Sequence, residues 1–410
     1  MAEVFPVERI PAEVGKIASR LRDSGFEVWY VGGAVRDVLL ELLLGQSAAR
    51  VGDFDIATSA RPEQVQALFR RTVPVGIEHG TVAVLDQSGI AHEVTTFRKD
   101  VKTDGRHAEV EFGVTLEDDL ARRDFTINAV AVHPWSGEIR DPFGGRQDLR
   151  ARVVRAVGDP AMRFREDRLR VLRALRFAAT LGFTLDPATW DALVAAASDL
   201  AHLSRERVRD EWLKMLATSV PSAGVGLWRR AGVWREVWPE LADFDRRAEG
   251  ALDEIEPRDP VLLTAAALGY VAGGSDAAEA AVRRLRFSSR DVERVRWVVG
   301  GLAEPLPAPG ATREVRRWLS RHRASARDII AVSEPRARRA DLLAAVEAVI
   351  ASGDAIGIRD LAVTGDDLQA AGVAPGKAMG ELLRRLLDEV MDEPWRNTRE
   401  HLLARARELS

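Results

Sequence analysis

Two aspartates one residue apart are the residues of this chain that most directly suggest chemistry. Asp53 and Asp55 lie in the run from Gly52 to Ile56. If this run is a strand, the two side chains point to one face, because residues i and i+2 of a strand share a face. Two converging carboxylates suit Mg²⁺, a hard cation that prefers oxygen ligands and bridges to phosphates. An ordinary turn or surface pair would give the same pattern.

A glycine pair upstream strengthens the interpretation as a metal site. Gly32 and Gly33 predict a turn whose backbone N–H groups can approach a phosphate chain with no side chain in the way. Glu93, on a predicted neighbouring strand, is the candidate for a third acid of a two-metal site. Alternatively, Glu93 is an ordinary exposed charge on an edge strand. Together these residues predict phosphoryl or nucleotidyl transfer.

A second cluster, from Arg122 to Asn128, could hold the rest of a nucleotide. Arg122 and Arg123 could neutralise a triphosphate. Asp124 and Asn128, at i and i+4 if the segment is helical, could hydrogen-bond a ribose. The alternative is an ordinary helix start with Asp124 as its cap.

A third cluster could select the base. Asp167 and Arg170, at i and i+3, would share one helix face, with Arg173 and Arg176 continuing the stripe. A carboxylate accepts and a guanidinium donates hydrogen bonds. Cytosine and adenine each offer an amino donor beside a ring-nitrogen acceptor, so one Asp/Arg pair matches both, whereas uracil and guanine place an oxygen where the amino group should be. A plain salt bridge between Asp167 and Arg170 is the alternative.

The composition fits a globular protein that contacts phosphates. The chain has 410 residues, 46% hydrophobic and 30% charged, and no cysteine, so any metal is held by oxygen or imidazole. The net charge is −4, yet residues 146–176 and 313–339 each carry a local excess of arginine. Arginine suits bidentate phosphate contact, although solvated helix faces would look the same.

The chain divides into a mixed head and a helical remainder. Residues up to 148 predict a small sheet with two helices, the second preceded by Ser59 as a candidate N-cap. The predicted strands are 28–31, 81–85, 91–97 and 109–112, and the predicted helices are 35–44, 62–69, 163–181, 187–197 and 205–217. Residues 304–310 predict a linker, and a second helical region follows from Thr312.

No segment predicts a membrane protein. The N-terminus lacks an apolar signal region, and the longest apolar run, 261–274, is too short to span a bilayer. We therefore expect a cytoplasmic protein without a membrane partner. The sequence does not specify an oligomeric state.

The order of the motifs resembles the bacterial class II tRNA nucleotidyltransferase/poly(A) polymerase family. The matched segments are 32–37, 53–55, 122–129, 141–145, 163–170 and 203–207. The stretch from Leu361 to Leu387 is similar to the tail of CCA-adding enzymes, whereas 220–350 matches loosely. Ala108 departs from the family's usual proline, and residues 42–51 form a longer spacer than is common.

The resemblance implies an α+β fold with a polymerase-β-like nucleotidyltransferase head, followed by an all-helical neck, body and tail. The expected domains are 1–148 (catalytic head), 149–205 (neck with the nucleotide-selecting helix), 206–300 (body) and 301–410 (tRNA-binding tail). The 97–112 loop matches the family's flexible loop, which helps switch the site from CTP to ATP, and the 203–207 segment buttresses the pocket in the family.

The resemblance also implies a mechanism. Asp53 and Asp55 hold two Mg²⁺, and the tRNA 3′ hydroxyl attacks the α-phosphate of CTP or ATP. Gly33, Arg36 and Arg123 hold the triphosphate, while Asp167 and Arg170 read the base with support from Arg173 and Arg176.

The leading hypothesis is therefore CCA addition to tRNA. An A-adding enzyme and a poly(A) polymerase share the chemistry and stay open. A catalytically inactive RNA-binding protein would not need paired carboxylates, and a small-molecule nucleotidyltransferase would not need a long basic helical region.

Overall fold

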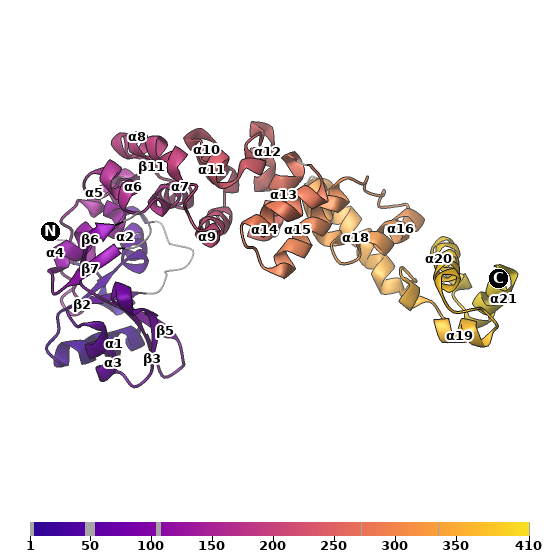
Figure 1. The fold of residues 1–410 in the computed structure, drawn as a ribbon, viewed down its shortest axis with the longest axis horizontal. Helices are drawn as coiled ribbons and strands as arrows, with labels where there is room; N and C mark the ends of the chain where they lie inside the picture. The colour runs from indigo at the N-terminus through magenta and orange to yellow at the C-terminus, as the bar shows by residue number, and fades with distance from the viewer. Residues whose placement is uncertain (1–3, 46–53, 104–107, 272, 335, 410) are drawn as a thin grey trace. The chain divides into compact units, whose positions relative to one another are not determined.

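The computed structural model describes residues 4–45, 54–103, 108–271, 273–334 and 336–409, and it separates into two compact units, Met1–Ala242 and Asp243–Ser410 (Figure 1). Among these described residues, no helix is long and apolar enough to cross a membrane.

The first unit begins with a mixed seven-stranded sheet in the order β3-β4-β5-β2-β1-β8-β9. Strands β2 and β5 are parallel, and the other neighbouring pairs are antiparallel. The strands are β1 (Val28–Val31), β2 (Asp55–Thr58), β3 (Thr72–Gly76), β4 (Thr81–Leu85), β5 (Ala91–Thr96), β8 (Ala131–Val132) and β9 (Ile139–Arg140). A separate hairpin joins β6 (Arg98–Thr103) to β7 (Ala108–Phe112).

Helices cover the sheet and bury its inner strand β1 on both faces. All four residues of β1 are buried. The head helices are α1 (Ala12–Asp23), α2 (Gly33–Leu44), α3 (Pro62–Leu68), α4 (Leu116–Ala121) and α5 (Gly145–Ala151). Helices α1 and α3 contact each other beside the sheet (Figure 1). Leu116 and Leu120 of α4 pack with Trp29 and Ala57 of β1 and β2, which fixes the C-terminal end of α4 near these strands.

Most predicted head elements are present with small shifts of their ends, and one predicted cap is wrong. Strands β1 and β4 match the predicted bounds, and α2 begins two residues earlier than expected. The residue that precedes α3 is Arg61, whose N–H donates to Gln64 Oε1 at 2.8 Å. Ser59 instead accepts the N–H of Glu27 at 2.9 Å, so it extends the pairing of β1 with β2 and does not cap the helix.

The predicted single helix over 163–181 is two helices, α6 (Pro160–Glu166) and α7 (Leu169–Leu181). Asp167 lies between them in an extended conformation, with φ −145°, and its Oδ1 accepts the N–H of Leu169 at 3.0 Å. The short carboxylate satisfies a backbone donor that a continuous helix would have satisfied itself. Gly182, with φ 65°, ends α7 where the sequence predicted.

The rest of the first unit is mainly helical. It contains α8 (Pro187–Ala196), α9 (Arg205–Leu216), α10 (Pro221–Ala231) and α11 (Trp234–Val237). One short parallel pair, β10 (Val153–Val154) with β11 (Thr184–Leu185), joins the segments before α6 and after α7. A buried cluster of Trp212, Trp228, Trp234 and Trp238 holds α9, α10 and α11 together.

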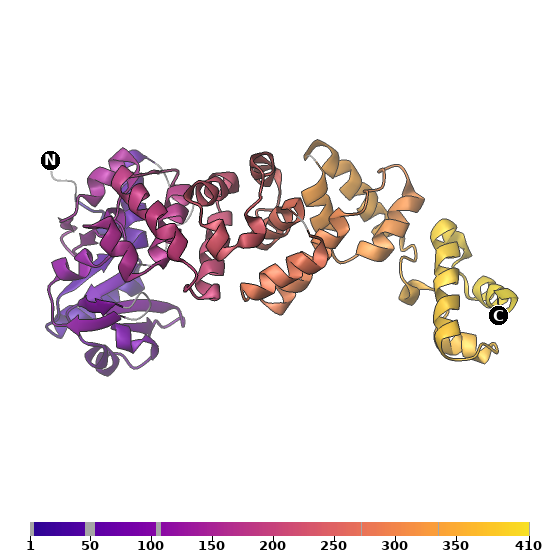
Figure 2. The same ribbon diagram turned by 45° about the horizontal axis from the view of Figure 1, so that its top comes forward.

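The second unit consists of short helices packed around their own hydrophobic clusters. Its helices are α12 (Arg246–Ala251), α13 (Pro260–Val271), α14 (Ser275–Arg284), α15 (Ser289–Leu302), α16 (Thr312–His322), α17 (Ala326–Ser333), α18 (Arg336–Ser352), α19 (Gly365–Ala370), α20 (Lys377–Asp392) and α21 (Arg399–Leu409). Trp318, Ile329 and Val346 lie in one cluster. Leu386 and Leu402 join α20 to α21 in another, and the two yellow helices lie side by side in Figure 2. The predicted linker 304–310 separates α15 from α16.

Candidate active site

A cavity of 460 Å³ in the first unit collects most of the residues that the sequence singled out. It is lined by Gly32, Gly33, Arg36, Asp55, Arg122, Arg123, Asp124, Asn128, Asp167, Leu169, Arg170, Arg173, Phe177 and Arg207. All but Leu169, Phe177 and Arg207 are predicted site residues. Segments more than a hundred residues apart along the chain therefore meet around one space of the size that a small ligand occupies.

Asp55 forms one wall of this cavity against the backbone of Gly32. It begins β2 and lies opposite Val31, the last residue of β1. Gly32 has φ +85°, and a Cβ built on it would lie 2.4 Å from Asp55 Oδ2. Only glycine allows both the turn and the close approach of the carboxylate.

The other two predicted acids, Asp53 and Glu93, are not among the described residues that line the cavity. Asp53 lies outside the described residues. Glu93 is exposed on β5 and precedes Val94, which pairs in parallel with Ile56, so Glu93 and Asp55 occupy corresponding positions on neighbouring strands. Glu93 is not part of the cavity lining among the described residues. Within that same part of the chain, no three histidine, aspartate or glutamate side chains form a metal cluster.

One buried aspartate holds the two cavity arginines at the end of α4. Arg122 and Arg123 reach Asp119 at 2.7 and 3.2 Å. Burial alone would raise the pKa of Asp119, but Arg123 and Arg122 outweigh it and hold the pKa below its ordinary value. The carboxylate is therefore charged at neutral pH and keeps both guanidinium groups beside the cavity.

Asp124 joins the head to α7. Its carboxylate accepts Asn128 Nδ2 at 3.1 Å and Arg173 Nε at 2.8 Å. Burial opposes the charged form, but the charge of Arg173 and the hydrogen bonds from Asn128, Arg173 and the Phe125 N–H lower the pKa of Asp124 to about 2. Asn128 Oδ1 in turn accepts Arg36 Nη1 at 2.9 Å.

The predicted geometry of this segment was wrong in detail. Thr126–Asn128 is a 3-10 turn, and Asp124 lies before it in non-helical backbone, so Asp124 and Asn128 meet without the helix that the sequence suggested. The alternative, Asp124 as a helix cap, is not what its contacts show, because the carboxylate bonds mainly to side chains.

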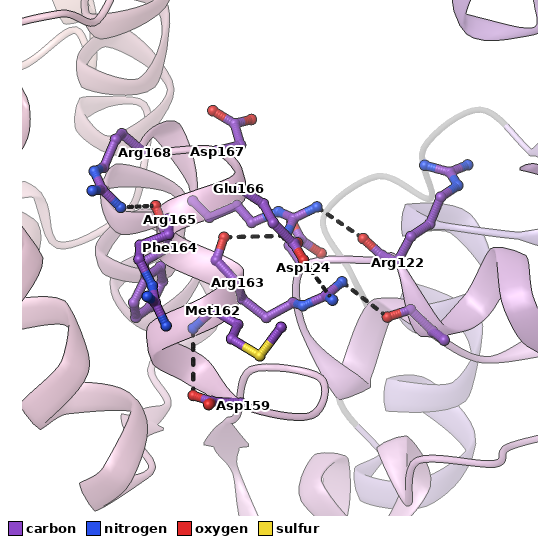
Figure 3. Close-up of polar contacts among 12 residues, drawn as sticks. Arg122, Asp124, Asp159, Met162, Arg163, Phe164, Arg165, Glu166, Asp167 and Arg168 are labelled. Carbon is purple, nitrogen blue, oxygen red and sulfur yellow. Dashed lines mark hydrogen bonds and ion pairs between the residues drawn. The ribbon is translucent and has the colours of Figure 1, made fainter. Parts of the chain in front are cut away.

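Asp167 and Arg170 both line the cavity, but not as an i, i+3 pair on one helix. Asp167 pairs with Arg207 at 2.7 Å, and Arg170 pairs with Glu166 at 2.7 Å. Figure 3 shows Asp167 pointing away from Glu166 and Arg163. The helix break at Asp167 explains the difference, because Asp167 lies outside the helix that contains Arg170. The alternative prediction, a salt bridge between Asp167 and Arg170, is therefore also wrong.

Phe177 is one of three cavity residues that were not among the predicted site residues. Three guanidinium groups surround its ring, with the carbons of Arg176, Arg36 and Arg173 at 4.0, 5.1 and 5.4 Å from the ring centre. The aromatic face stabilises and separates like charges. Phe177 follows Arg173 by four residues, so extending the arginine stripe along the helix face could have found it. Arg176 itself lies outside the cavity lining and pairs with Glu211.

Arg207 and Leu169 are the other two cavity residues that were not predicted as site residues. Arg207 had been singled out only within the 203–207 segment of the family resemblance, and the structure places its guanidinium on Asp167. Leu169 begins α7 directly after the helix break, and no periodicity of the sequence marks it as a cavity residue.

Acidic side chains from other segments neutralise much of the positive charge that the sequence shows in 313–339. Arg313 and Arg317 share Asp392 at 2.6 and 2.8 Å. Acids from other segments pair with further members: Arg316 with Asp354, Arg321 with Glu304, Arg323 with Asp360 and Arg327 with Glu347. Local sequence charge therefore overstates the positive surface here, because the neutralising acids lie far along the chain.

Three family models match successive parts of the chain. Residues 28–155 match the poly A polymerase head domain, 182–245 match the RNA and SrmB binding site of polymerase A, and 266–406 match tRNA nucleotidyltransferase domain 2.

Similar proteins extend these matches to almost the whole chain. The CCA-adding enzyme of Levilactobacillus brevis is 34% identical over 405 residues, which are 97% of this chain and 98% of the relative. That of Anoxybacillus flavithermus is 46% identical over 228 residues, which span 55% of either chain. The crystal structure of the Bacillus stearothermophilus CCA-adding enzyme in complex with CTP has a TM-score of 0.82, with 32% identity and coverage of 97% of this chain and 96% of that one.

The mixed sheet, the helical remainder and the head-domain match together define a nucleotidyltransferase with a polymerase-type head. The chain belongs to the family of CCA-adding enzymes. This confirms the family resemblance, the enzyme class and the α+β fold class that the sequence predicted.

Proposed function

We propose that this chain adds C, C and A to the 3′ ends of tRNA, using CTP and ATP and no nucleic-acid template. The observation that carries the proposal is the shared cavity. It places the acid at the start of β2, the arginines at the end of α4 and the Asp167/Arg170 segment around one space. Membership of the CCA-adding family supports the substrates.

The cavity wall fits a divalent cation. Asp55 presents its carboxylate beside Gly32, and Glu93 holds the corresponding position on the next strand. Mg²⁺ prefers such oxygen ligands. Asp53 and Asp55 would hold it, with Glu93 as a third acid. When bound, Mg²⁺ would neutralise triphosphate charge and favour the ionised 3′ hydroxyl.

The side chains of the chain itself would bind and orient the nucleotide. Gly32 and Gly33 leave backbone room for phosphate oxygens, and Arg36, Arg122 and Arg123 hold the triphosphate. The tRNA 3′ oxygen attacks the α-phosphorus, the bond to the bridging oxygen breaks, and pyrophosphate leaves.

Base selection is assigned to Asp167, between α6 and α7, and to Arg170 in the first turn of α7. Asp167 accepts the amino group of cytosine or adenine, and Arg170 donates to the neighbouring ring nitrogen. Asp124 and Asn128 would orient the ribose. Arg173 and Arg176 support the segment from α7 through Asp124 and Glu211.

The helical remainder of the chain would bind the tRNA whose 3′ end reacts in this cavity. We assign residues 1–148 to the catalytic head, 149–205 to the neck, 206–300 to the body and 301–410 to a tRNA-binding tail. Matches to the RNA-binding region, over 182–245, and to tRNA nucleotidyltransferase domain 2, over 266–406, support RNA binding by the helical part of the chain. The matched segments cross the proposed boundaries at 205 and 300, and the division between the two compact units lies within the proposed body.

Primer extension tests the proposal. Purified protein and Mg²⁺ are mixed with a tRNA lacking CCA, and separately with a tRNA ending in CC, together with CTP, ATP or both. Three added nucleotides with both substrates, and two with CTP alone, are expected. Extension of only the CC-ended tRNA would identify an A-adding enzyme, and a long ladder with ATP would identify a poly(A) polymerase. No extension would support a binding protein instead.

A further inference from the structure

A second cavity of the first unit, with a volume of 430 Å³, lies at the C-terminal end of α7. Residues of α7, β11, α8 and α10 line it, and α7 and α10 contact each other (Figure 1). Phe177 lines the cavity of the proposed nucleotide site, whereas Ala178 and Ala179, the next two residues of α7, line the second cavity. The two cavities share no lining residue among those that the structure describes. The second cavity can therefore hold a ligand of its own.

Small residues create the hollow where α7 and α10 approach each other. The approach is close at Gly224, because a Cβ built there would lie 3.3 Å from the Cβ of Ala179. Beside this contact the lining residues Ala179, Gly182 and Ala223 are too short to fill the space between the elements. Protein interiors leave few voids larger than a water molecule, so a hollow of this size is a place for an occupant.

The body of the cavity is apolar. Phe183, Leu185 and Leu227 supply aryl and alkyl surface, and no aspartate or glutamate is among the described lining residues. Such a surface favours an apolar ligand, because burying apolar area against it releases free energy roughly in proportion to that area. A nucleobase fits poorly, since its polar edges would need several partners that this lining does not offer.

Two hydrogen-bond donors complete the lining. Arg230 is exposed, and in the described part of the chain it has neither an ion pair nor a hydrogen bond. Trp190 is half-buried, and its indole N–H likewise has no acceptor among the residues that the structure describes. A guanidinium donates paired hydrogen bonds to a carboxylate, and an indole N–H donates one more. The lining therefore carries one positive charge that an anionic ligand would balance.

We propose that the second cavity binds an apolar carboxylate, such as a medium-chain fatty acid. The hydrocarbon chain lies against Phe183, Leu185 and Leu227, and the carboxylate accepts hydrogen bonds from Arg230 and Trp190. This combination of an apolar body with a few polar groups that fix orientation is typical of small-molecule sites. The proposal does not depend on the reaction at the other cavity.

Isothermal titration calorimetry of the full-length protein with decanoate, kept below its micelle-forming concentration, tests the proposal. We expect one decanoate to bind per chain. Decyltrimethylammonium has the same chain length and the opposite charge, so it should bind at least about tenfold more weakly. Arg230→Met keeps an apolar stem and removes the donor, and it should weaken decanoate binding about tenfold.

Arg235→Met is the matched control. Arg235 is also an exposed arginine of the first unit without a partner among the described residues, but it does not line the cavity. The control should keep the wild-type affinity for decanoate within about twofold. Ala223→Trp is the second variant. It places a large side chain at an exposed lining position and should abolish binding without disturbing the core.

Competition with CTP distinguishes the two cavities, because the other cavity also presents arginines. Excess CTP should leave decanoate binding unchanged. Displacement by CTP would place the acid in the other cavity and would overturn the proposal. The same conclusion would follow from no binding of decanoate, from several bound per chain, or from equal affinity for the cationic probe. Unchanged affinity in both Arg230→Met and Ala223→Trp would also contradict it.

Discussion

At the scale of single residues, Gly32 and Asp55 show why the glycine turn and the acid occur together. The turn needs a positive φ, and the space above the Gly32 α-carbon is occupied by the Asp55 carboxylate. A side chain at position 32 would move the acid and strain the turn at once. The glycine is therefore part of the acid's position and not only a flexible link.

Gly32→Ala should abolish most nucleotide incorporation. The added Cβ would lie 2.4 Å from Asp55 Oδ2. Gly25→Ala is the matched control, because Gly25 has a nearly identical φ of +87° and no atom within 4 Å of the added Cβ. Both variants should lose about 1 kcal/mol of stability through the strained backbone, measured by urea unfolding. Only Gly32→Ala should lose CTP incorporation by about a hundredfold or more. Equal activity in the two variants would disprove the positional role.

Asp55→Asn and Asp53→Ala should each abolish incorporation and leave tRNA binding nearly intact. Both changes remove a negative oxygen donor from the proposed Mg²⁺ site, and an uncharged group binds this cation poorly. Gel extension measures incorporation, and filter binding measures tRNA affinity. Incorporation that persists above a few per cent of wild type would remove the substituted residue from the metal site.

At the scale of elements, the ion pair between Asp124 and Arg173 joins the segment after α4 to α7. Arg173 is partly buried in the cavity lining, and the charge of Asp124 raises its pKa. Arg170, earlier on α7, also reaches the end of α4, because its Nη2 donates to the carbonyl of Arg122 at 2.8 Å. Loss of the Asp124 charge should therefore weaken the link between head and neck helix.

The stabilisation from Asp124 should disappear in acid. Its pKa is about 2 in the folded protein, below the ordinary value, so its contribution is full above about pH 4 and falls as pH drops toward 2. That contribution is about 2 kcal/mol near neutral pH. The stability difference between wild type and Asp124→Asn should therefore shrink by about 1 kcal/mol between pH 6 and pH 3. Urea unfolding at the two pH values measures it, and a constant difference would contradict the assignment.

The sequence predicted elements well where local patterns decide them. Strands β1 and β4 are continuous apolar runs with clear ends, and their bounds match. The break at Asp167 was not predictable in the same way, because the arginine-rich run from Arg163 onward has good helix formers on both sides. Contacts with Arg207 and with the N–H of Leu169 decide it, and these depend on the fold.

The candidate site was predictable as a set of residues but not as a set of partners. Motif spacing brought together the residues that line the cavity. It did not reveal that Asp167 pairs with Arg207, that Glu166 pairs with Arg170, or that Phe177 lies among three arginines. Such pairings depend on side-chain directions at the junction of α6, α7 and α9, which local sequence does not encode.

At the scale of the whole molecule, the chain forms two compact units with separate hydrophobic clusters. The sheet, the cavity and the tryptophan cluster belong to residues 1–242. The clusters around Trp318 and Leu386 belong to residues 243–410. Each unit buries its own core, which is the requirement for independent folding.

A fragment of residues 243–410 should fold alone and bind tRNA without adding nucleotides. Its hydrophobic clusters are complete within the fragment, and it lacks every residue of the cavity. A single cooperative urea transition and salt-dependent tRNA binding are expected, by circular dichroism and filter binding. A folded fragment without measurable tRNA affinity would contradict the assignment of the tail.

The most direct test of base selection by the protein is the sequence of the added nucleotides when all four nucleoside triphosphates compete. A tRNA lacking CCA is incubated with protein, Mg²⁺ and equal concentrations of the four nucleoside triphosphates, and the product 3′ ends are sequenced. We predict CCA on nearly all products of the wild-type protein, and U and G among the products of Asp167→Ala. Frequent U or G in wild-type products, a homopolymer, or unchanged selection in Asp167→Ala would contradict selection by the protein.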